Sequence, residues 1–498
     1  MILQGDPRAS ALILRDRVLS FEDLNSRIAV LSGWLRTFVP EPGARVATWL
    51  AKTELACLMP LAAARAGLVH VPINPLLKHA QVAHILADSG AKVLISNAAR
   101  LATLERGDLA DAVAVDELAA WEAAETAGVA LDPSEQDPAG LAAILYTSGS
   151  TGSPKGVMLS HANLWLGAVS VARYLALTPQ DRILAVLPLS FDYGQNQLLC
   201  AWYAGAAAIP LDYLTARDVI KAVDRYDATT LAAVPPLWIQ LVEHDWPEGV
   251  AANLRRLTNS GGALGAELVG RLRRLFPNAA LYPMYGLTEA FRSTYLDPSL
   301  VDSHPTSMGR AIPFAEVMVA ADDGSEAAVG EEGELVHAGP LVAQGYWRDA
   351  ERTAERFRPA PAWSRLGGMA VWSGDRVRRD AEGLLYFVGR RDAMIKSAGN
   401  RISPQEVEDA AMETGLVAES VAVGIPDARL GQVIHLVARA SSAPDDGDRS
   451  AALLAAMSRA LPAFMVPRAV SWRQTMPLGS NGKLDRAGLA RELAGEPA

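Results

Sequence analysis

The stretch YTSGSTGSPKG, Tyr146 to Gly156, decides the fold class of this chain. It directly follows an apolar run, LAAIL at 141–145, which is typical of a buried strand. Five of its eleven residues are Ser or Thr, three are Gly and one is Lys155. Glycine lets a backbone approach a ligand closely, and the hydroxyls and the lysine add donors and positive charge. The stretch predicts a phosphate-binding loop at the carboxyl end of a strand, with a flexible surface turn as the alternative.

The segments on both sides of this loop alternate between helix and strand. Ser20, with Asp23 three residues later, is a helix-capping pattern at the start of the first helix. Helical patterns lie at 20–36, 54–67 and 79–90, and strand-like apolar runs at 45–50, 70–75, 91–96, 181–190, 228–236 and 253–262. This rhythm predicts an α/β fold in which helices cover mostly parallel sheets.

The pattern changes twice in the second half of the chain. From residue 310 onward, short β segments separated by turns replace the alternation, as in EVMVAADDG, GELVHAG and GLLYFVG, and they predict a β-rich subdomain. Near 389–396 a further change begins a tail of mixed helices and strands. We therefore expect a large N-terminal domain at 1–391 and a small α+β domain at 392–498.

Composition excludes several classes of function. The chain has 498 residues, half of them hydrophobic and a fifth charged, so it can bury the cores of two or three domains. Its net charge of −10 and its lack of Lys or Arg runs argue against nucleic acid binding. No uncharged apolar stretch reaches membrane-spanning length and no signal-peptide pattern is present, so we expect a cytoplasmic protein without a membrane partner. Cys57 and Cys200 lie in apolar surroundings and are expected to be buried free thiols.

A second motif, YPMYGLTEA at 282–290, places a carboxylate after a strand. A carboxylate beside a polyphosphate requires a cation between the two, so Glu289 is a candidate Mg²⁺ ligand. If the first loop did not bind phosphate, the same motif would be interpreted as a glycine turn with an exposed acidic side chain.

Two further motifs carry one charged side chain each. WSGDRVRRD (372–380) presents Asp375 after a glycine, where one carboxylate can accept both hydroxyls of a ribose. PLGSNGKLDRAGL (477–489) presents Lys483, which takes part in chemistry only if the small domain folds over the large one. On its own, each motif also fits an ordinary turn or a solvated lysine.

Together these motifs resemble those of the adenylate-forming superfamily, which comprises acyl-CoA synthetases, luciferases and the adenylation domains of peptide synthetases. They occur in the family's order over nearly the whole chain, and VGRRDAMIKSAGNRISPQEVE (388–408) adds the family's hinge region. The resemblance implies ATP and Mg²⁺ as cofactors. It assigns ATP binding to Thr147, Ser148, Gly149, Ser150, Thr151, Gly152, Lys155, Gly262, Tyr285, Gly286, Asp375 and Arg390.

The resemblance also implies catalytic roles. Thr288 contacts phosphate, Glu289 serves Mg²⁺, and Lys483 contacts the substrate carboxylate and the α-phosphate. Asp392 is the hinge about which the small domain rotates between two half-reactions, and Gly399 lies where the pantetheine arm passes during thioester formation. No Ser-His-Asp set is needed for this chemistry, so the histidine that follows the first loop is read as structural.

The acid pocket is expected around two polar residues, Asp192 and Arg292. Asp192 follows Phe191 at the place where amino-acid-activating relatives carry an aspartate for the substrate ammonium. A buried carboxylate needs a partner, which is either that ammonium or Arg292; alternatively, Arg292 binds a second carboxylate of the substrate. The full set of expected pocket residues is Phe191, Asp192, Tyr193, Asn196, Gly261, Met284 and Arg292.

Three functions remain open. The favoured one is a free-standing ligase that adenylates a small amino acid and loads it onto the phosphopantetheine thiol of an acyl carrier protein in natural-product biosynthesis. The alternative is an acyl-CoA synthetase for a short or medium-chain carboxylic acid, because the chain has YGLTE rather than YGPTE. FDYG and MYGLTEAFRSTYL also resemble exosortase-associated acyl-CoA ligases. A non-catalytic relative has the least support, since all the charged motif residues are present.

Overall fold

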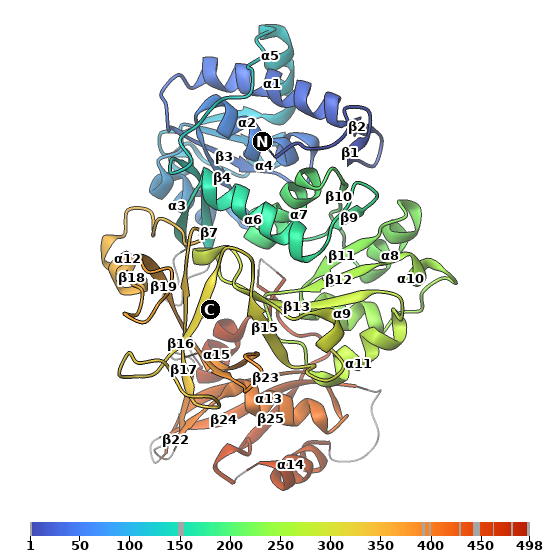
Figure 1. Ribbon diagram of the computed structural model, residues 1–498, viewed down its shortest axis with the longest axis vertical. Coiled ribbons are helices and arrows are strands. Elements are labelled where there is room, and N and C mark those ends of the chain that lie inside the picture. The colour runs from blue at the N-terminus through green and yellow to red at the C-terminus, as the bar shows by residue number, and fades with distance from the viewer. Residues whose placement is uncertain are drawn as a thin grey trace.

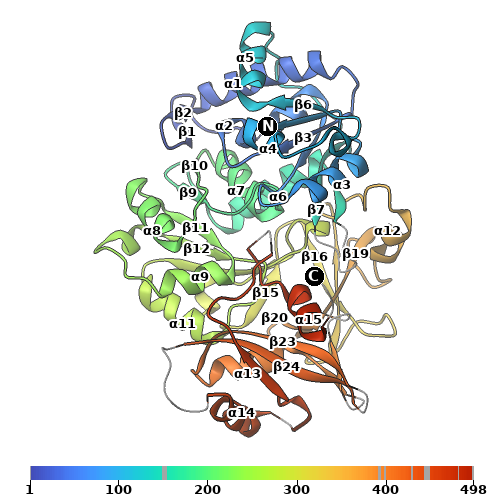
Figure 2. The same cartoon turned by 180° about the vertical axis from the view of Figure 1, so that it is seen from behind.

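The computed structural model describes residues 2–147, 154–390, 394–397, 400–427, 430–441, 449–461, 463–479 and 482–495. The predicted mixed α/β fold is confirmed, with helix-flanked sheets followed by a smaller α+β part that carries the C-terminus (Figure 1). Figure 2 shows the same arrangement from behind, with β23 (Val417–Asp427), β24 (Gly431–Ala440) and α14 (Arg449–Ala460) at the bottom of the view and α15 (Arg486–Ala494) above them. Within the described residues, no helix is both long and apolar enough to cross a bilayer.

The two strands that precede and follow the glycine-rich stretch in the sequence lie at one edge of an N-terminal sheet. The sheet runs in the order β6 (Val113–Asp116), β5 (Val93–Ser96), β3 (Arg45–Trp49), β4 (Val69–Pro72), β7 (Leu141–Thr147) and β8 (Lys155–Ser160). All neighbours pair parallel except β7 and β8, which form an antiparallel hairpin in which Thr147 faces Lys155. The sequence predicted β7 but not β8, so the glycine-rich stretch connects two strands of a hairpin.

Helices accompany this first sheet as the rhythm predicted. They are α1 (Phe21–Phe38), α2 (Glu54–Ala66), α3 (His79–Ser89), α4 (Ala98–Leu101), η1 (Arg106–Leu109) and α5 (Glu117–Ala127). Ser20 caps α1, and its hydroxyl accepts from the Asp23 backbone while the Asp23 carboxylate accepts from the Ser20 backbone, which confirms the predicted capping pattern.

A second, larger sheet joins the parallel region to the β-rich region without a break. Its order is β16 (Glu316–Ala320), β17 (Glu332–Ala338), β19 (Met369–Arg379), β20 (Leu385–Arg390), β15 (Ser307–Ala311), β14 (Thr294–Tyr295), β13 (Ala280–Tyr285), β12 (Arg256–Asn259), β11 (Thr230–Ala233), β9 (Arg182–Ala185), β10 (Ala207–Pro210), β1 (Ser10–Ile13) and β2 (Val18–Ser20), with β18 (Phe357–Pro359) beside β19. Pairing is parallel from β1 to β13 and antiparallel beyond β13. The short strand β14 makes this switch directly after the predicted Glu289 motif.

The helices of this region connect its strands. They are α6 (His161–Tyr174), α7 (Asp192–Tyr203), α8 (Ala216–Arg225), α9 (Pro235–Val242), α10 (Val250–Asn253), α11 (Ala266–Leu275), η2 (Thr288–Ala290), η3 (Pro298–Leu300) and α12 (Ala350–Arg356). The strand expected at 228–236 ends at Ala233, because Pro235 begins α9, where a missing N–H costs no hydrogen bond. Cys57 and Cys200 are buried and free, as expected.

The C-terminal part has its own hydrophobic core. Its elements are β21 (Ile395–Ser397), β22 (Asn400–Ile402), α13 (Pro404–Glu413), β23 (Val417–Asp427), β24 (Gly431–Ala440), α14 (Arg449–Ala460), η4 (Ala463–Met465), β25 (Ala469–Trp472) and α15 (Arg486–Ala494). An ion pair of 2.8 Å between Arg439 Nη2 and Glu243 Oε1 ties it to the central region. The loop before α15 then carries Lys483 into that region.

Candidate active site

Lys155 and Glu289 meet beside the glycine-rich stretch. Lys155 begins β8 and Glu289 lies in the η2 turn that follows β13, and the distance from Lys155 Nζ to Glu289 Oε1 is 3.3 Å. Tyr346 joins the two, because its hydroxyl donates to Glu289 Oε1 at 2.6 Å and accepts from Lys155 Nζ at 2.8 Å. The motifs contained no signal for Tyr346, which reaches the pair through a bridge between its backbone and Val157 of β8.

The electrostatics of this pair keep Glu289 ionised. Burial alone would raise the pKa of Glu289, but Lys155 and the Tyr346 hydroxyl hold that pKa below its usual value. Burial lowers the pKa of Lys155, against the effect of Glu289. A single ionised carboxylate next to a phosphate site suits Mg²⁺, which takes one or two protein carboxylates and completes its shell with phosphate oxygens and water. The residues present therefore fit the ion that the sequence implied.

Thr288 and Asp192 form a second contact at the same strand ends. Asp192 is the first residue of α7 and is only 4% exposed, and Thr288 Oγ1 donates to its Oδ1 at 3.0 Å. Burial raises the pKa of Asp192, and the nearby charges of Arg292 and Lys483 oppose that rise. Asp192 forms no ion pair within 4.0 Å with any residue that the structure describes.

The small domain delivers Lys483 to this place. Its Nζ lies 4.7 Å from the ring centroid of Phe191, the residue before Asp192. Burial lowers the pKa of Lys483, while the negative charge of Asp192 opposes the change. Gly261 makes room for the lysine, since a Cβ at that position would lie 2.6 Å from Lys483 Cε. Lys483 was expected to take part in chemistry only if the small domain folds over the large one, and in this structure Lys483 does lie against the large domain.

Three residues predicted for the nucleotide form a third cluster. Tyr285, at the end of β13, donates from its hydroxyl to Asp375 Oδ2 at 2.5 Å. Arg390 Nε lies 3.3 Å from Asp375 Oδ1, and the two residues face each other across β19 and β20. Gly286 has no room for a side chain, because a Cβ there would lie 2.9 Å from Arg292 Cα, and a Cβ on Gly262 would lie 3.0 Å from Pro235.

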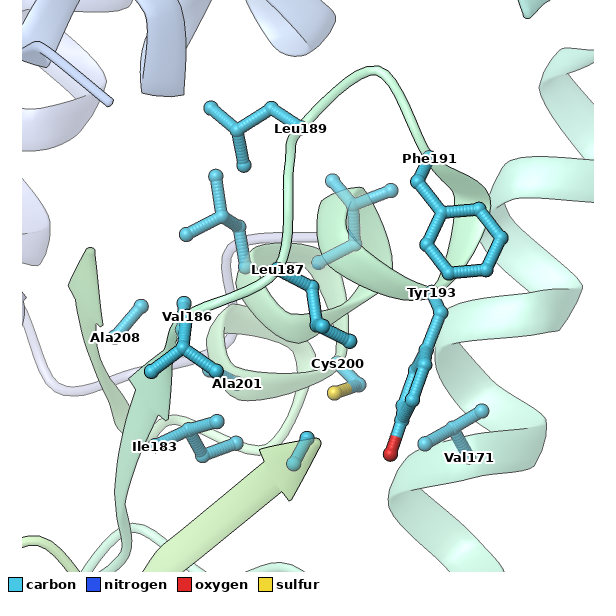
Figure 3. Close-up of a cluster of buried hydrophobic side chains, with 14 of the residues drawn as sticks. Val171, Ile183, Val186, Leu187, Leu189, Phe191, Tyr193, Cys200, Ala201 and Ala208 are labelled. Carbon is cyan, nitrogen blue, oxygen red and sulfur yellow. The ribbon is translucent and has the colours of Figure 1, made fainter. Parts of the chain in front are cut away.

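Four of the predicted pocket residues line one cavity of about 20 Å³, namely Tyr193, Asn196, Met284 and Arg292. Figure 3 shows Phe191 and Tyr193 on the side of α7 that faces α6, with Tyr193 beside Val171. The Tyr193 hydroxyl lies 2.5 Å from Thr258 Oγ1, and the sulfur of Met284 accepts from the hydroxyl of Tyr174 at 2.9 Å. The cavity is therefore narrow and partly polar, with no room for a long alkyl chain in this conformation.

Several predicted residues are not tested by the structure. Asp392 and Gly399, the expected hinge and pantetheine path, lie outside the described residues, as do Ser148, Gly149, Ser150, Thr151 and Gly152. Thr147 is described at the end of β7. His161 is the first residue of α6, and burial lowers its pKa. Arg356, which the motifs also missed, lies close enough to Tyr346, Lys155 and Glu289 to affect their charges.

Comparison with known families decides the identity of this site. The sequence model of the AMP-binding enzyme matches residues 3–347, and that of the AMP-binding enzyme C-terminal domain matches residues 406–483. The chain belongs to the AMP-binding enzyme family. The resemblance inferred from the motifs is thereby confirmed.

Curated relatives of this AMP-binding enzyme act on different acids and acceptors. It is 32% identical to a feruloyl-CoA synthase of Amycolatopsis sp, covering 98% of this chain and 96% of the relative. It is 30% identical to the L-proline--[L-prolyl-carrier protein] ligase of Pseudomonas fluorescens, covering 98% of this chain and 97% of the relative. It is also 30% identical to tyrocidine synthase 2 of Brevibacillus parabrevis over 97% of this chain and 13% of that protein. This AMP-binding enzyme is accordingly an AMP-forming ligase that joins an acid to a thiol.

Solved structures share the fold over nearly the full length. ATP-bound MatB from Rhodopseudomonas palustris superposes with a TM-score of 0.87 at 24% identity, covering 99% of this chain and 97% of that chain. The o-succinylbenzoate CoA synthetase MenE from Bacillus subtilis, in complex with its acyl-adenylate, gives 0.82 at 25% identity, covering 97% and 95%. The two-domain fold of this AMP-binding enzyme is thus that of adenylate-forming ligases.

Proposed function

We propose that this AMP-binding enzyme adenylates a small amino acid with ATP and transfers it to the phosphopantetheine thiol of an acyl carrier protein. The proposal rests on the surroundings of Asp192. A buried carboxylate that accepts from the Thr288 hydroxyl and forms no ion pair with a described residue has capacity for a ligand cation. An amino acid's ammonium group supplies that cation, and the similarity to a prolyl-carrier protein ligase agrees with it.

The proposed chemistry begins with an activation step. A carboxylate is a poor electrophile, so its oxygen attacks the α-phosphorus of ATP, pyrophosphate leaves, and the acid gains AMP as a leaving group. Lys483 lies on the Asp192 side of the site and is proposed to reduce the repulsion between the carboxylate and the α-phosphate. Lys155 and Thr288 are proposed to hold the phosphates, and Glu289 to hold Mg²⁺, which neutralises their charge when bound.

The remaining residues are proposed to hold the nucleoside and to permit the second step. Asp375 accepts the ribose hydroxyls with Arg390 beside it, and Tyr285 stacks near the adenine. A thiol then attacks the adenylate carbonyl, AMP leaves, and a thioester forms. We further propose that residues 392–498 rotate about Asp392 for this step, past Gly399.

A hydroxamate assay with ATP tests the substrate class. The panel comprises small amino acids, proline, acidic amino acids and straight-chain acids from acetate to dodecanoate, with each amino acid matched to its deamino analogue. We expect a signal from an amino acid and none from its analogue. Asp192→Asn, which keeps the shape of the side chain, should abolish the amino acid signal, because it leaves the substrate ammonium without a counter-ion.

The contrary result supports the alternative function. If only plain carboxylic acids react, and Asp192→Asn leaves their rates unchanged, the enzyme is an acyl-CoA synthetase, in line with its similarity to a feruloyl-CoA synthase. The acceptor is tested separately by offering the adenylate to CoA and to a phosphopantetheinylated carrier protein and measuring the mass of each product.

A further inference from the structure

Arg292 is a buried cation whose Nε has no hydrogen-bond acceptor among the residues that the structure describes. It is 2% exposed and ranks among the largest fully buried side chains of the protein. Its guanidinium lies 4.5 Å from the ring centroid of Tyr193, but its Nε has no acceptor, and among the described residues no carboxylate lies within ion-pair distance. A guanidinium is removed from water at considerable cost unless acceptors and a counter-ion replace the water. Such a group points to a partner that binds from outside.

Other unpaired polar atoms line the same cavity. Asn196 Oδ1 and Thr230 Oγ1 are buried without a hydrogen-bond partner in the described part of the chain, and both residues line the cavity together with Arg292. Nearly all buried polar groups in proteins find partners, so three unpaired ones at one cavity are informative. Apolar packing alone would place aliphatic side chains at these positions.

The charges around this cavity indicate which ligand balances them. Asp192 contributes one negative charge, and Arg292 and Lys483 contribute one positive charge each; both cations act on Asp192. The substrate's reacting carboxylate offsets Lys483, and its ammonium offsets Asp192. Arg292 then remains unbalanced for a neutral amino acid, whereas a substrate with a second carboxylate neutralises it.

We propose that Arg292 is the specificity-determining residue of the acid pocket and binds a second carboxylate, so that the substrate is an acidic amino acid. This inference rests on the proposed function. A guanidinium matches a carboxylate through parallel hydrogen bonds, and the Tyr193 ring packs against the guanidinium of Arg292.

Arg292 has one competing explanation, which is that it only compensates Asp192. The two residues influence each other electrostatically, but they form no ion pair within 4.0 Å, and Asp192 uses the Thr288 hydroxyl instead. If Arg292 only compensated the charge of Asp192, the unpaired position of its Nε at the cavity would have no explanation.

The test compares acidic amino acids with neutral isosteres. ATP–pyrophosphate exchange is measured with aspartate, asparagine, glutamate and glutamine for the wild type and for Arg292→Met and Arg292→Lys. We expect the wild type to prefer an acidic amino acid over its amide. Arg292→Met should lower kcat/KM for that substrate by about 100-fold or more and reverse the preference, while Arg292→Lys should retain the preference in part.

Two outcomes would overturn the inference. In the first, the wild type prefers a neutral amino acid, which leaves the proposed function intact but excludes a second carboxylate. In the second, Arg292→Met, folded by its thermal transition, lowers the rates of acidic and neutral amino acids by the same factor, which identifies a structural role.

A third outcome separates this inference from the proposed function. If no amino acid reacts, succinate and glutarate are compared with propionate and butyrate. Preference for the dicarboxylates supports carboxylate binding by Arg292 and contradicts ammonium binding by Asp192. Preference for the monocarboxylates contradicts both the role of Arg292 and the proposed function.

Discussion

Replacing Gly261 by alanine is expected to impair the adenylation step through Lys483, a residue more than two hundred positions away. Gly261 has φ = +82°, and the added Cβ would lie 2.6 Å from Lys483 Cε and 3.4 Å from its Nζ. Non-bonded carbons pack at about 3.5–4.0 Å, so the lysine side chain must move by about 1 Å. The positive φ adds a stability cost of about 1–2 kcal/mol for a residue with a Cβ.

The size of the kinetic effect follows from that displacement. A misplacement of about 1 Å in a reacting group can lower a rate by about 100-fold, which corresponds to about 2.7 kcal/mol of activation free energy. The assay is ATP–pyrophosphate exchange with the best acid from the substrate panel, because it reports adenylation without the thiol step. Gly265→Ala is the matched control, since Gly265 has φ = −68° and its Cβ meets nothing within 4 Å.

A double-mutant cycle shows whether the loss runs through Lys483. Lys483→Ala removes the atom that lies closest to the new Cβ and leaves Val234 Cγ1 at 3.4 Å, so Gly261→Ala should cause little further loss of exchange activity in that background. The stability cost of the positive φ should persist in both backgrounds. Equal fold-losses with and without the lysine side chain would refute the reasoning, because the effect of Gly261→Ala would then be independent of Lys483.

Three further predictions concern protonation and the nucleotide site. Tyr346→Phe removes a hydroxyl that contacts the ionised Glu289, so the KM for ATP should rise about tenfold in the exchange assay; an unchanged KM would contradict it. Since burial raises the pKa of Asp192, amino acid activation in the exchange assay should fall as pH drops through that raised pKa, and an exchange rate that stays constant as the pH falls would contradict it. Burial lowers the pKa of His70 from 6.5 to about 3 and that of His337 to about 4, so below pH 6.5 the unfolded state binds protons that the folded state does not. The free energy of unfolding in urea should therefore be lower at pH 5.5 than at pH 7.5 by about 1 kcal/mol for each histidine. His70→Gln should reduce this difference between the two pH values.

The parts of the fold that the sequence predicted are those governed by local chemistry. Strand β7 was predicted because its apolar run is buried, and the N-cap at Ser20 because a cap and its partner lie three residues apart. Glu289 was expected after a strand, and the η2 turn that carries it follows β13. Asp375 lies instead within the antiparallel strand β19, where it faces Arg390 of β20. Such local signals need no knowledge of distant packing.

The parts that the sequence did not predict depend on pairing between distant segments. Tyr346 completes the contact between Lys155 and Glu289, yet a lone tyrosine after a glycine has no distinguishing pattern. The sequence predicted a β-rich subdomain within the large domain but not how it connects to the parallel strands. Strand β14 makes this connection, and its two residues are too few to show a strand pattern. The hydrogen bond from Thr288 to Asp192 likewise depends on how η2 and α7 pack.

The position of Lys483 has a consequence for the order in which the protein acquires activity during its synthesis. The residues assigned to ATP and to the acid emerge from the ribosome first, and the lysine that packs against Phe191 follows only after the whole small domain has been made. On the proposed assignment, a nascent chain with a folded large domain binds ATP but does not form an adenylate. A reactive intermediate is therefore not released by incomplete chains, and a nonsense mutation between residues 391 and 483 is expected to yield a nucleotide binder rather than a partly active ligase.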